Sequence, residues 1–302
     1  MAHTGAPGDV ASEIASLEAE VTKGGASASV CQRFLRLTRD AQVRRPHAVV
    51  KASETVLGGR HAKGDDMWVV LEQAAVAAMD CGSLALAEQC VSRLSKQFPK
   101  SARAGKLRGM LLESTGDYKG ALDVYDEILE EVPTEQRVRK RRAALFRARG
   151  AIELAVKELC EYLDTFMSDA DAWMELSEMY LMRGAFKRAA FCLEEVLLLH
   201  PQNGAVHVRL AEALYSSGGA EAVAAARRHF SAAVDLSGGA DTRALAGLAA
   251  CAAAQARGEK KGRPEEAGEL YALAGAHLVN RYEQLCPALE PHARAMVEAK
   301  AR

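Results

Sequence analysis

Five glycines stand at one constant spacing in this chain of 302 residues. Gly82, Gly116, Gly150, Gly184 and Gly218 follow one another at intervals of 34 residues. A fixed interval of this length is typical of a chain built from repeated supersecondary units, which bury their apolar faces only against their neighbours. The spacing therefore favours an elongated array over a single central core.

Other residues keep the same register. Seventeen residues after the glycine, three units carry a proline and the remaining unit carries Met167. The prolines are Pro99, Pro133 and Pro201, the alanines five residues after the glycine are Ala87, Ala121, Ala155 and Ala189, and the small residues seven before it are Gly109, Ala143, Ser177 and Ala211. Proline cannot continue a helix, and small side chains let two helices approach closely. This is the tetratricopeptide (TPR) pattern, and it predicts an all-α fold: a TPR superhelical solenoid of antiparallel helix pairs.

Composition agrees with helices, because 49% of the residues are hydrophobic but only 5% are aromatic, and alanine has the highest helix propensity. The pattern predicts four segments. They are a flexible N-terminus with a possible helix over 1–29, N-terminal capping helices over 30–63, the TPR array over 64–240, and a degenerate hairpin with a C-terminal capping helix over 241–302. Helices are expected near 30–41, 47–57 and 242–257. Asp65 and Asp66 are expected to cap the first helix of the array, and Trp68 and Trp173 to pack in the core.

Several classes of function are disfavoured. A net charge of −1 argues against a protein that coats nucleic acid. Seven scattered cysteines without a C-x-x-C pair indicate a reducing compartment, with neither a disulfide framework nor a zinc site. No stretch is long and apolar enough to span a bilayer, and no signal peptide is visible, so a soluble intracellular chain is expected. Motifs of hydrolases, metalloproteases and nucleotide-binding enzymes are missing, so we expect no catalytic residue, cofactor or metal.

In a TPR solenoid the first helix of each pair lines the concave face. The candidate partner-binding residues on that face are Arg103, Lys106, Met110, Arg137, Lys140, Arg147, Met174, Glu178, Glu212 and Tyr215. This groove is basic at one end and acidic to apolar at the other, so a partner segment with the opposite gradient would bind in one direction. The alternative is that these are solvated side chains that each contribute little.

The sequence bears on two specific ligands of the groove, chaperone tails and phosphate groups. Modules that clamp the acidic tails of chaperones use an asparagine where this chain has Met110 or Ala144, which disfavours that role. The basic stretch at 137–149 could contact phosphates of RNA or anionic lipid. A partner's carboxylates are preferred, because no aromatic residues are interleaved as single-stranded nucleic acid would require.

Four stretches carry a more specific resemblance. They are GDDMWVVLEQAAVAAMDCG at 64–82, QFPKSARAGKLRGMLLESTGDYKGALDVYDEILEEVPT at 97–134, AFKRAAFCLEEVLLLHPQN at 185–203, and an oversized fifth hairpin that begins YSSGGAEAV. The D-D-x-W, the F-P stop and A-A-F-C-L-E-E are not required by the TPR consensus. With these motifs the chain resembles the family of subunit 2 of the endoplasmic reticulum membrane protein complex, over about residues 64–248.

The resemblance implies a non-catalytic TPR scaffold, present as a soluble peripheral subunit on the cytoplasmic face of the endoplasmic reticulum membrane. Such a subunit holds cytosolic segments of membrane-embedded subunits, docks a further soluble subunit, and supports insertion of tail-anchored and multipass proteins. It implies no nucleic acid, no small-molecule substrate and only indirect membrane contact. The alternative from the repeats alone is a free TPR adaptor in another assembly, such as a co-chaperone or an RNA-processing scaffold.

Overall fold

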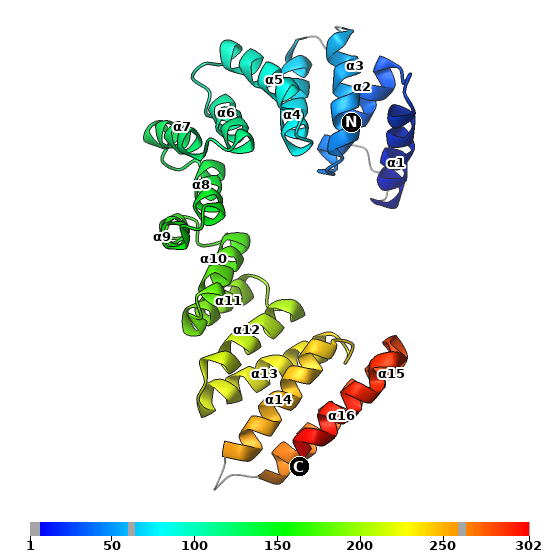
Figure 1. Cartoon of the computed structure of the whole chain (residues 1–302), viewed down its shortest axis with the longest axis vertical. Coiled ribbons are helices and arrows are strands. Elements are labelled where there is room, and N and C mark those ends of the chain that lie inside the picture. Colours follow the sequence, from blue (N-terminus) through cyan, green and yellow to red (C-terminus); the bar gives the residue numbers. More distant parts are fainter. Residues whose placement is uncertain (1–6, 60–63, 259–263, 302) are drawn as a thin grey trace. The chain divides into compact units, whose positions relative to one another are not determined.

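The computed structural model describes residues 7–59, 64–258 and 264–301, and the regular secondary structure in these ranges is helical throughout (Figure 1). Consecutive helices pack as antiparallel pairs, which confirms the predicted all-α TPR fold class. By its internal contacts the chain divides into two compact units, with the division between Gly150 and Ala151. The segment boundaries expected from the sequence stay predictions.

Unit 1 contains α1 to α8. Their bounds are α1 Pro7–Lys23, α2 Ala28–Asp40, α3 Pro46–Gly58, α4 Asp65–Asp80, α5 Leu84–Gln97, α6 Ala102–Thr115, α7 Tyr118–Glu131 and α8 Gln136–Ala148. The helix pairs α4–α5 and α6–α7 pack face to face, and α8 follows on α7. Helix α1 lies in the stretch expected to be flexible with a possible helix, and the N-terminal residues before Pro7 lie outside the described residues.

Unit 2 contains α9 to α16. Their bounds are α9 Ile152–Leu163, α10 Ala170–Met182, α11 Phe186–Leu199, α12 Gly204–Ser217, α13 Ala220–Leu236, α14 Thr242–Gly258, α15 Pro264–Leu285, the 3-10 turn η1 Pro287–Leu289 and α16 Glu290–Ala301. Three helix pairs, α10–α11, α12–α13 and α14–α15, follow in order, and α16 packs on α15. Helix α15 begins at a proline, which has no N–H to lose in a first turn.

The turn glycines have the backbone that the repeat requires. Gly82, Gly116, Gly150, Gly184 and Gly218 all have positive φ, between 67° and 83°. At Gly116 the left-handed residue ends α6, and the next residue, Asp117, accepts a hydrogen bond from the backbone N–H of Gly120 to begin α7. Each of these glycines therefore follows the end of one helix, and the next helix begins two residues after it.

Close helix contact explains the small residues of the register. A Cβ placed on Gly109 would lie 2.2 Å from Cε1 of Tyr125, whose side chain is fully buried. Unit 2 repeats the device outside the strict register, because a Cβ on Gly247 would lie 2.3 Å from the ring of Phe230. In both units a glycine on one helix admits a large aromatic ring from the helix beside it.

The expectation for the two tryptophans is confirmed in one respect and corrected in another. Trp68 and Trp173 pack against the buried clusters of α4–α5 and α11–α12, but both remain half-buried. Each also packs edge-on against a partly exposed phenylalanine, Phe98 and Phe191 respectively. The largest fully buried side chains are instead Tyr125, Tyr162 and Phe34. The tryptophans therefore close the open edges of helix pairs, and the tyrosines and leucines fill the layers.

The expected aspartate cap is also corrected. Gly64 is the N-cap of α4 and makes no side-chain hydrogen bond, while Asp65 and Asp66 occupy the first turn. Carboxylates there act through the helix dipole instead of through a capping hydrogen bond.

Candidate partner-binding surface

The ten residues expected to line the concave face all lie on helices that the repeat register makes the first of a pair, and they are divided between the two units. Arg103, Lys106 and Met110 are on α6, Arg137, Lys140 and Arg147 on α8, Met174 and Glu178 on α10, and Glu212 and Tyr215 on α12. Six of the ten therefore belong to unit 1 and four to unit 2. That these residues bind a partner stays a prediction.

The apolar members of this set face inward more than expected. Met110 packs against the cluster centred on Leu71 and Leu94 in unit 1, and Met174 and Tyr215 pack against the two clusters of unit 2. Each side chain is partly buried. Their main contribution is therefore to hold successive first helices together, and only their outer edges are open to a partner.

Ion pairs join successive first helices on the same side. Glu72 of α4 pairs with Arg103 of α6, Glu178 of α10 pairs with Arg209 of α12 across 3.0 Å, and Glu212 of α12 pairs with Arg243 of α14. Each glutamate precedes its arginine by 31 residues, slightly less than one repeat. The acidic residues expected to make one end of the groove acidic are thus compensated by arginines, and that end carries less free charge than the sequence indicated.

Arg209 and Arg243 were missed by the sequence reasoning, although the repeated interval of 31 residues from glutamate to arginine could have revealed them. The hydrogen bond to Glu212 raises the pKa of Arg243, and the hydrogen bond to Glu72 raises that of Arg103. Both guanidinium groups therefore stay charged and held by their carboxylates.

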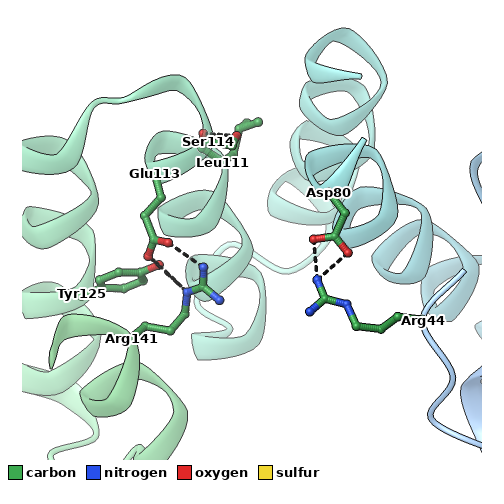
Figure 2. Close-up of polar contacts among 7 residues, drawn as sticks. All are labelled: Arg44, Asp80, Leu111, Glu113, Ser114, Tyr125 and Arg141. Atoms are coloured by element: carbon green, nitrogen blue, oxygen red, sulfur yellow. Dashed lines mark hydrogen bonds and ion pairs between the residues drawn. The ribbon is translucent and has the colours of Figure 1, made fainter. Parts of the chain in front are cut away.

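A more buried network crosses from α6 to α8 within unit 1 (Figure 2). Tyr125 donates its hydroxyl hydrogen to Oε1 of Glu113 at 2.5 Å, and Nη2 of Arg141 donates to Oε2 of the same carboxylate at 2.6 Å. Nε of Arg141 also lies 3.1 Å from Glu113 Oε1 and 3.2 Å from the Tyr125 oxygen. Burial and the adjoining carboxylate raise the pKa of Tyr125, so the phenol stays protonated and remains a donor.

This network gives arginines of the basic stretch at 137–149 a structural role. Burial by itself would lower the pKa of Arg141, but the hydrogen bonds and charge of Glu113 outweigh it and raise the pKa. Arg142 pairs with Asp126 at 2.6 Å, and Nε of Arg139 donates to the carbonyl oxygen of Pro133 at 2.8 Å. Three arginines of the stretch therefore have partners inside the chain: Arg141 and Arg142 bridge to neighbouring helices, and Arg139 bonds to the loop before its own helix.

Lys106 and Arg137 are the part of the predicted surface where positive charge gathers. Lys106 is half-buried on α6, and burial, followed by the charge of Arg137, lowers its pKa. Glu72 and Glu135 oppose this shift, and Arg103 adds to it. A half-buried ammonium between two guanidinium groups is a place where an added carboxylate would be stabilised.

Histidines meet in one place in unit 2. The Nε2–H of His207 donates to the carbonyl oxygen of Pro201 at 3.1 Å, because a carbonyl only accepts. In neutral His207 the other ring nitrogen is then an acceptor, and the Nδ1–H of His229 donates to it across 3.1 Å. Burial, and then the charges of His207 and Arg228, lower the pKa of His229. The histidine pair is therefore tied to the turn at Pro201.

Metal and thiol chemistry find little support in the described part of the chain. Among residues 7–59, 64–258 and 264–301 no group of three or more metal-ligating side chains comes together. All seven cysteines are free, and burial raises the pKa of Cys90 and Cys251 to about 11 and that of Cys192 to about 12. Such thiols remain protonated and unreactive near neutral pH.

Within the same described residues, no helix combines the length and the apolar character needed to cross a membrane.

Comparisons with known proteins agree on the fold. The chain aligns with a solved C-terminal part of a TPR repeat-containing protein from Cytophaga hutchinsonii, with a TM-score of 0.61 and 14% identity, over 86% of this chain and 98% of that one. At this identity the likeness concerns the fold alone. The TM-score is nevertheless high enough to support the TPR architecture in the described helices.

Comparisons of sequence are more specific. The model of the EMC2 TPR-like repeat domain matches residues 85–219. The ER membrane protein complex subunit 2-A of Xenopus laevis is 38% identical over 215 residues, which cover 71% of this chain and 72% of that protein. A subunit 2 from Dictyostelium discoideum is 30% identical over 67% of this chain and 64% of its own length. On this evidence the chain belongs to the family of ER membrane protein complex subunit 2.

Proposed function

We propose that this protein is a non-catalytic TPR scaffold subunit of an ER membrane protein complex. The 38% identity to a named subunit 2 over 71% of the chain carries the proposal. The fold supports it, because within each unit helix pairs stacked in order present their first helices on one side, on which a partner chain can lie. A role through protein contacts also fits a surface rich in ion pairs and described residues without a metal cluster.

We further propose that the protein works at the cytoplasmic face of the endoplasmic reticulum membrane. There it holds cytosolic segments of membrane-embedded subunits and docks a soluble subunit, so that tail-anchored and multipass proteins can be inserted. Its membrane association is through these partners. The predicted groove residues, above all the basic group around Lys106 and Arg137, supply the contacts to partner carboxylates.

Affinity purification from detergent-solubilised membranes tests this function. A tagged chain is expected to recover a constant set of membrane-embedded subunits together with a soluble one. Recovery of soluble proteins alone, from cells whose membranes contain the assembled complex, would contradict the proposal and favour a free TPR adaptor.

A charge-reversal variant tests the groove. Arg137→Glu, Lys140→Glu and Arg147→Glu together are expected to reduce recovery of membrane-embedded subunits without loss of helicity. The matched control is Lys96→Glu, Lys119→Glu and Lys187→Glu, which makes the same charge change at exposed positions on the second helices α5, α7 and α11. Equal recovery by the two variants would remove the groove from the proposed mechanism.

A further inference from the structure

Two pockets adjoin one another in unit 1. The first, of about 340 Å³, lies between the α2–α3 corner and α4, and the second, of about 330 Å³, lies between α4 and α6 beside Phe98. Both are lined by Val69, Glu72 and Arg103. Each volume is within the range of ligand pockets, roughly 300–1,000 Å³. The Glu72–Arg103 ion pair is therefore a shared wall between two hollows on one side of α4.

The walls of the first pocket come from one face of α4. Its lining residues on this helix are Val69, Glu72, Gln73, Val76, Ala77 and Asp80, whose spacing of three and four places them in one row. From the other side Val43 and Val49 complete an apolar floor. In the second pocket Trp68, Leu94, Phe98 and Leu107 supply the apolar surface. Both hollows therefore suit an apolar side chain.

The α2–α3 corner is held in place before any partner arrives. Nε2 of Gln73 donates to the Leu35 carbonyl at 3.0 Å and to Oγ1 of buried Thr38 at 3.1 Å, which ties α4 to the end of α2. Gln42 closes that helix end with φ of 53°, a left-handed conformation that residues with a side chain rarely adopt. A preformed pocket reduces the ordering that a ligand must undergo on binding.

Positive charge borders the two pockets at both ends. Arg39, Arg44, Arg45 and Arg103 line the first pocket, and three of them pair with an acid: Arg44 with Asp80, Arg45 with Glu18, and Arg103 with Glu72. Four arginines therefore face three acids. Nη2 of Arg44 lies 2.7 Å from both carboxylate oxygens of Asp80, yet its side chain is 78% exposed and can accept a second carboxylate (Figure 2). On α6, Lys106 stands between Ala104 and Leu107, which line the second pocket, and is close enough to Arg137 to feel its charge.

We propose that these two pockets are the docking site for an acidic polypeptide segment that inserts one apolar side chain into each and places carboxylates against Arg44 at one end and against Lys106 and Arg137 at the other. The inference deepens the proposed function, on which it rests for the source of the segment: another subunit of the complex. Charge complementarity selects an acidic chain, and the separate apolar hollows select side chains.

A phosphate polymer or a lipid surface fits less well. The Glu72 and Asp80 carboxylates stand within the lining, where a row of phosphates would bring a negative charge at every position, whereas a polypeptide can place apolar side chains there and its carboxylates elsewhere. The aromatic residues of the second pocket, Trp68 and Phe98, pack edge-on against each other across 5.4 Å between ring centres, so they form no flat platform for stacked bases.

Fluorescence anisotropy with the full chain tests the inference. The probes are labelled short peptides that carry two leucines flanked by glutamates, with the spacing between the leucines varied, and matched peptides with lysine in place of glutamate. We expect one acidic spacing to bind, its affinity to fall with salt, and the lysine peptides not to bind. Binding of anionic phosphatidylserine vesicles without binding of any acidic peptide would overturn the inference in favour of a lipid surface.

Two variants locate the site. Lys106→Glu with Arg137→Glu is expected to weaken peptide binding about tenfold or more, and Val69→Ser, at the shared wall, to weaken it about as much. Lys96→Glu with Lys119→Glu is the control, because it changes charge equally at exposed positions on the second helices α5 and α7. Circular dichroism checks that each variant folds. Equal affinity of the control and both site variants for the peptide would overturn the inference.

The two proposals can fail separately. Recovery of membrane-embedded subunits by a wild-type chain that binds no acidic peptide would overturn the docking site and leave the scaffold function standing. Peptide binding localised to Val69, Lys106 and Arg137 supports the docking site, and membrane subunits that are never recovered would count against the scaffold function alone.

Discussion

In each unit an arginine–glutamate ion pair joins successive first helices, but the two ion pairs differ in their exposure to solvent. In unit 1 Arg141 and Glu113 meet within a layer, where Tyr125 supplies a further donor and the side chains are 35% and 19% exposed. In unit 2 Arg243 and Glu212 meet at the surface, with side chains 64% and 36% exposed. A carboxylate that loses solvent depends on its protein partners, whereas an exposed one exchanges them for water. We therefore expect burial to determine how much each ion pair contributes to the free energy of unfolding.

The largest effect is expected when the buried bridge loses its acid. Glu113→Ala leaves Arg141 half-buried beside the Tyr125 hydroxyl with no carboxylate in that network, and should lower the free energy of unfolding by about 2–3 kcal/mol. Urea denaturation of the purified chain measures this change. An effect below that of the surface bridge would break the comparison.

Removal of the phenol hydroxyl should have an intermediate effect. Tyr125→Phe keeps the ring that fills the space against Gly109 and removes one hydrogen bond to a charged group, for an expected loss of about 1–2 kcal/mol. The double variant with Glu113→Ala isolates the coupling, which should be clearly non-additive because both groups share one network. Strict additivity would show that the three side chains do not act together.

The histidine pair gives unit 2 a modest pH dependence. The pKa of His229 in the folded chain lies below the ordinary value of 6.5, so the unfolded chain binds the proton more readily. The stabilising contribution is complete above about pH 6.5 and is lost as the pH falls from there through the folded-state pKa. His229→Gln should reduce the fall in melting temperature between pH 7.5 and 5.5, measured by differential scanning fluorimetry. An identical pH profile in the variant would contradict the assignment.

The smallest effect is expected at the exposed bridge. Glu212→Ala should cost about 0.2–1 kcal/mol in dilute buffer, and added salt should shrink even this difference, because the pair is open to solvent. Denaturation at low and high ionic strength provides the measurement. A loss as large as that of Glu113→Ala would show that exposure does not separate the two bridges.

The expectations that the structure confirms depend on contacts between residues that are close in the sequence. The turn glycines, the small residues and the proline stops act between neighbouring residues or within one helix pair, so a period in the sequence reports them directly. Gly109 against Tyr125 is such a contact. The partial exposure of Trp173 escaped this reasoning, because it depends on how far a neighbouring pair covers the open edge of a helix.

The candidate surface was foreseen in part. Its residues lie on the first helices as the register requires, but the partners of Arg103, Glu178 and Glu212 depend on side-chain reach across successive pairs. A list of inward positions treats each charge as available. The tertiary structure shows which charges already have a counter-charge and places Lys106 where the charge of Arg137 affects its pKa more than the charge of Glu72 or of Glu135 does.

By itself the sequence determined the repeat, its register, the helical fold class and the resemblance to one family, because glycine conformation, proline geometry and helix-to-helix fit are encoded at short range. Only the tertiary structure decided which carboxylates are buried, where two apolar pockets adjoin on α4, and which arginines border them. These features arise from the packing of α2 and α3 against α4 and from neighbouring repeats, and burial and electrostatic energy depend on that three-dimensional environment.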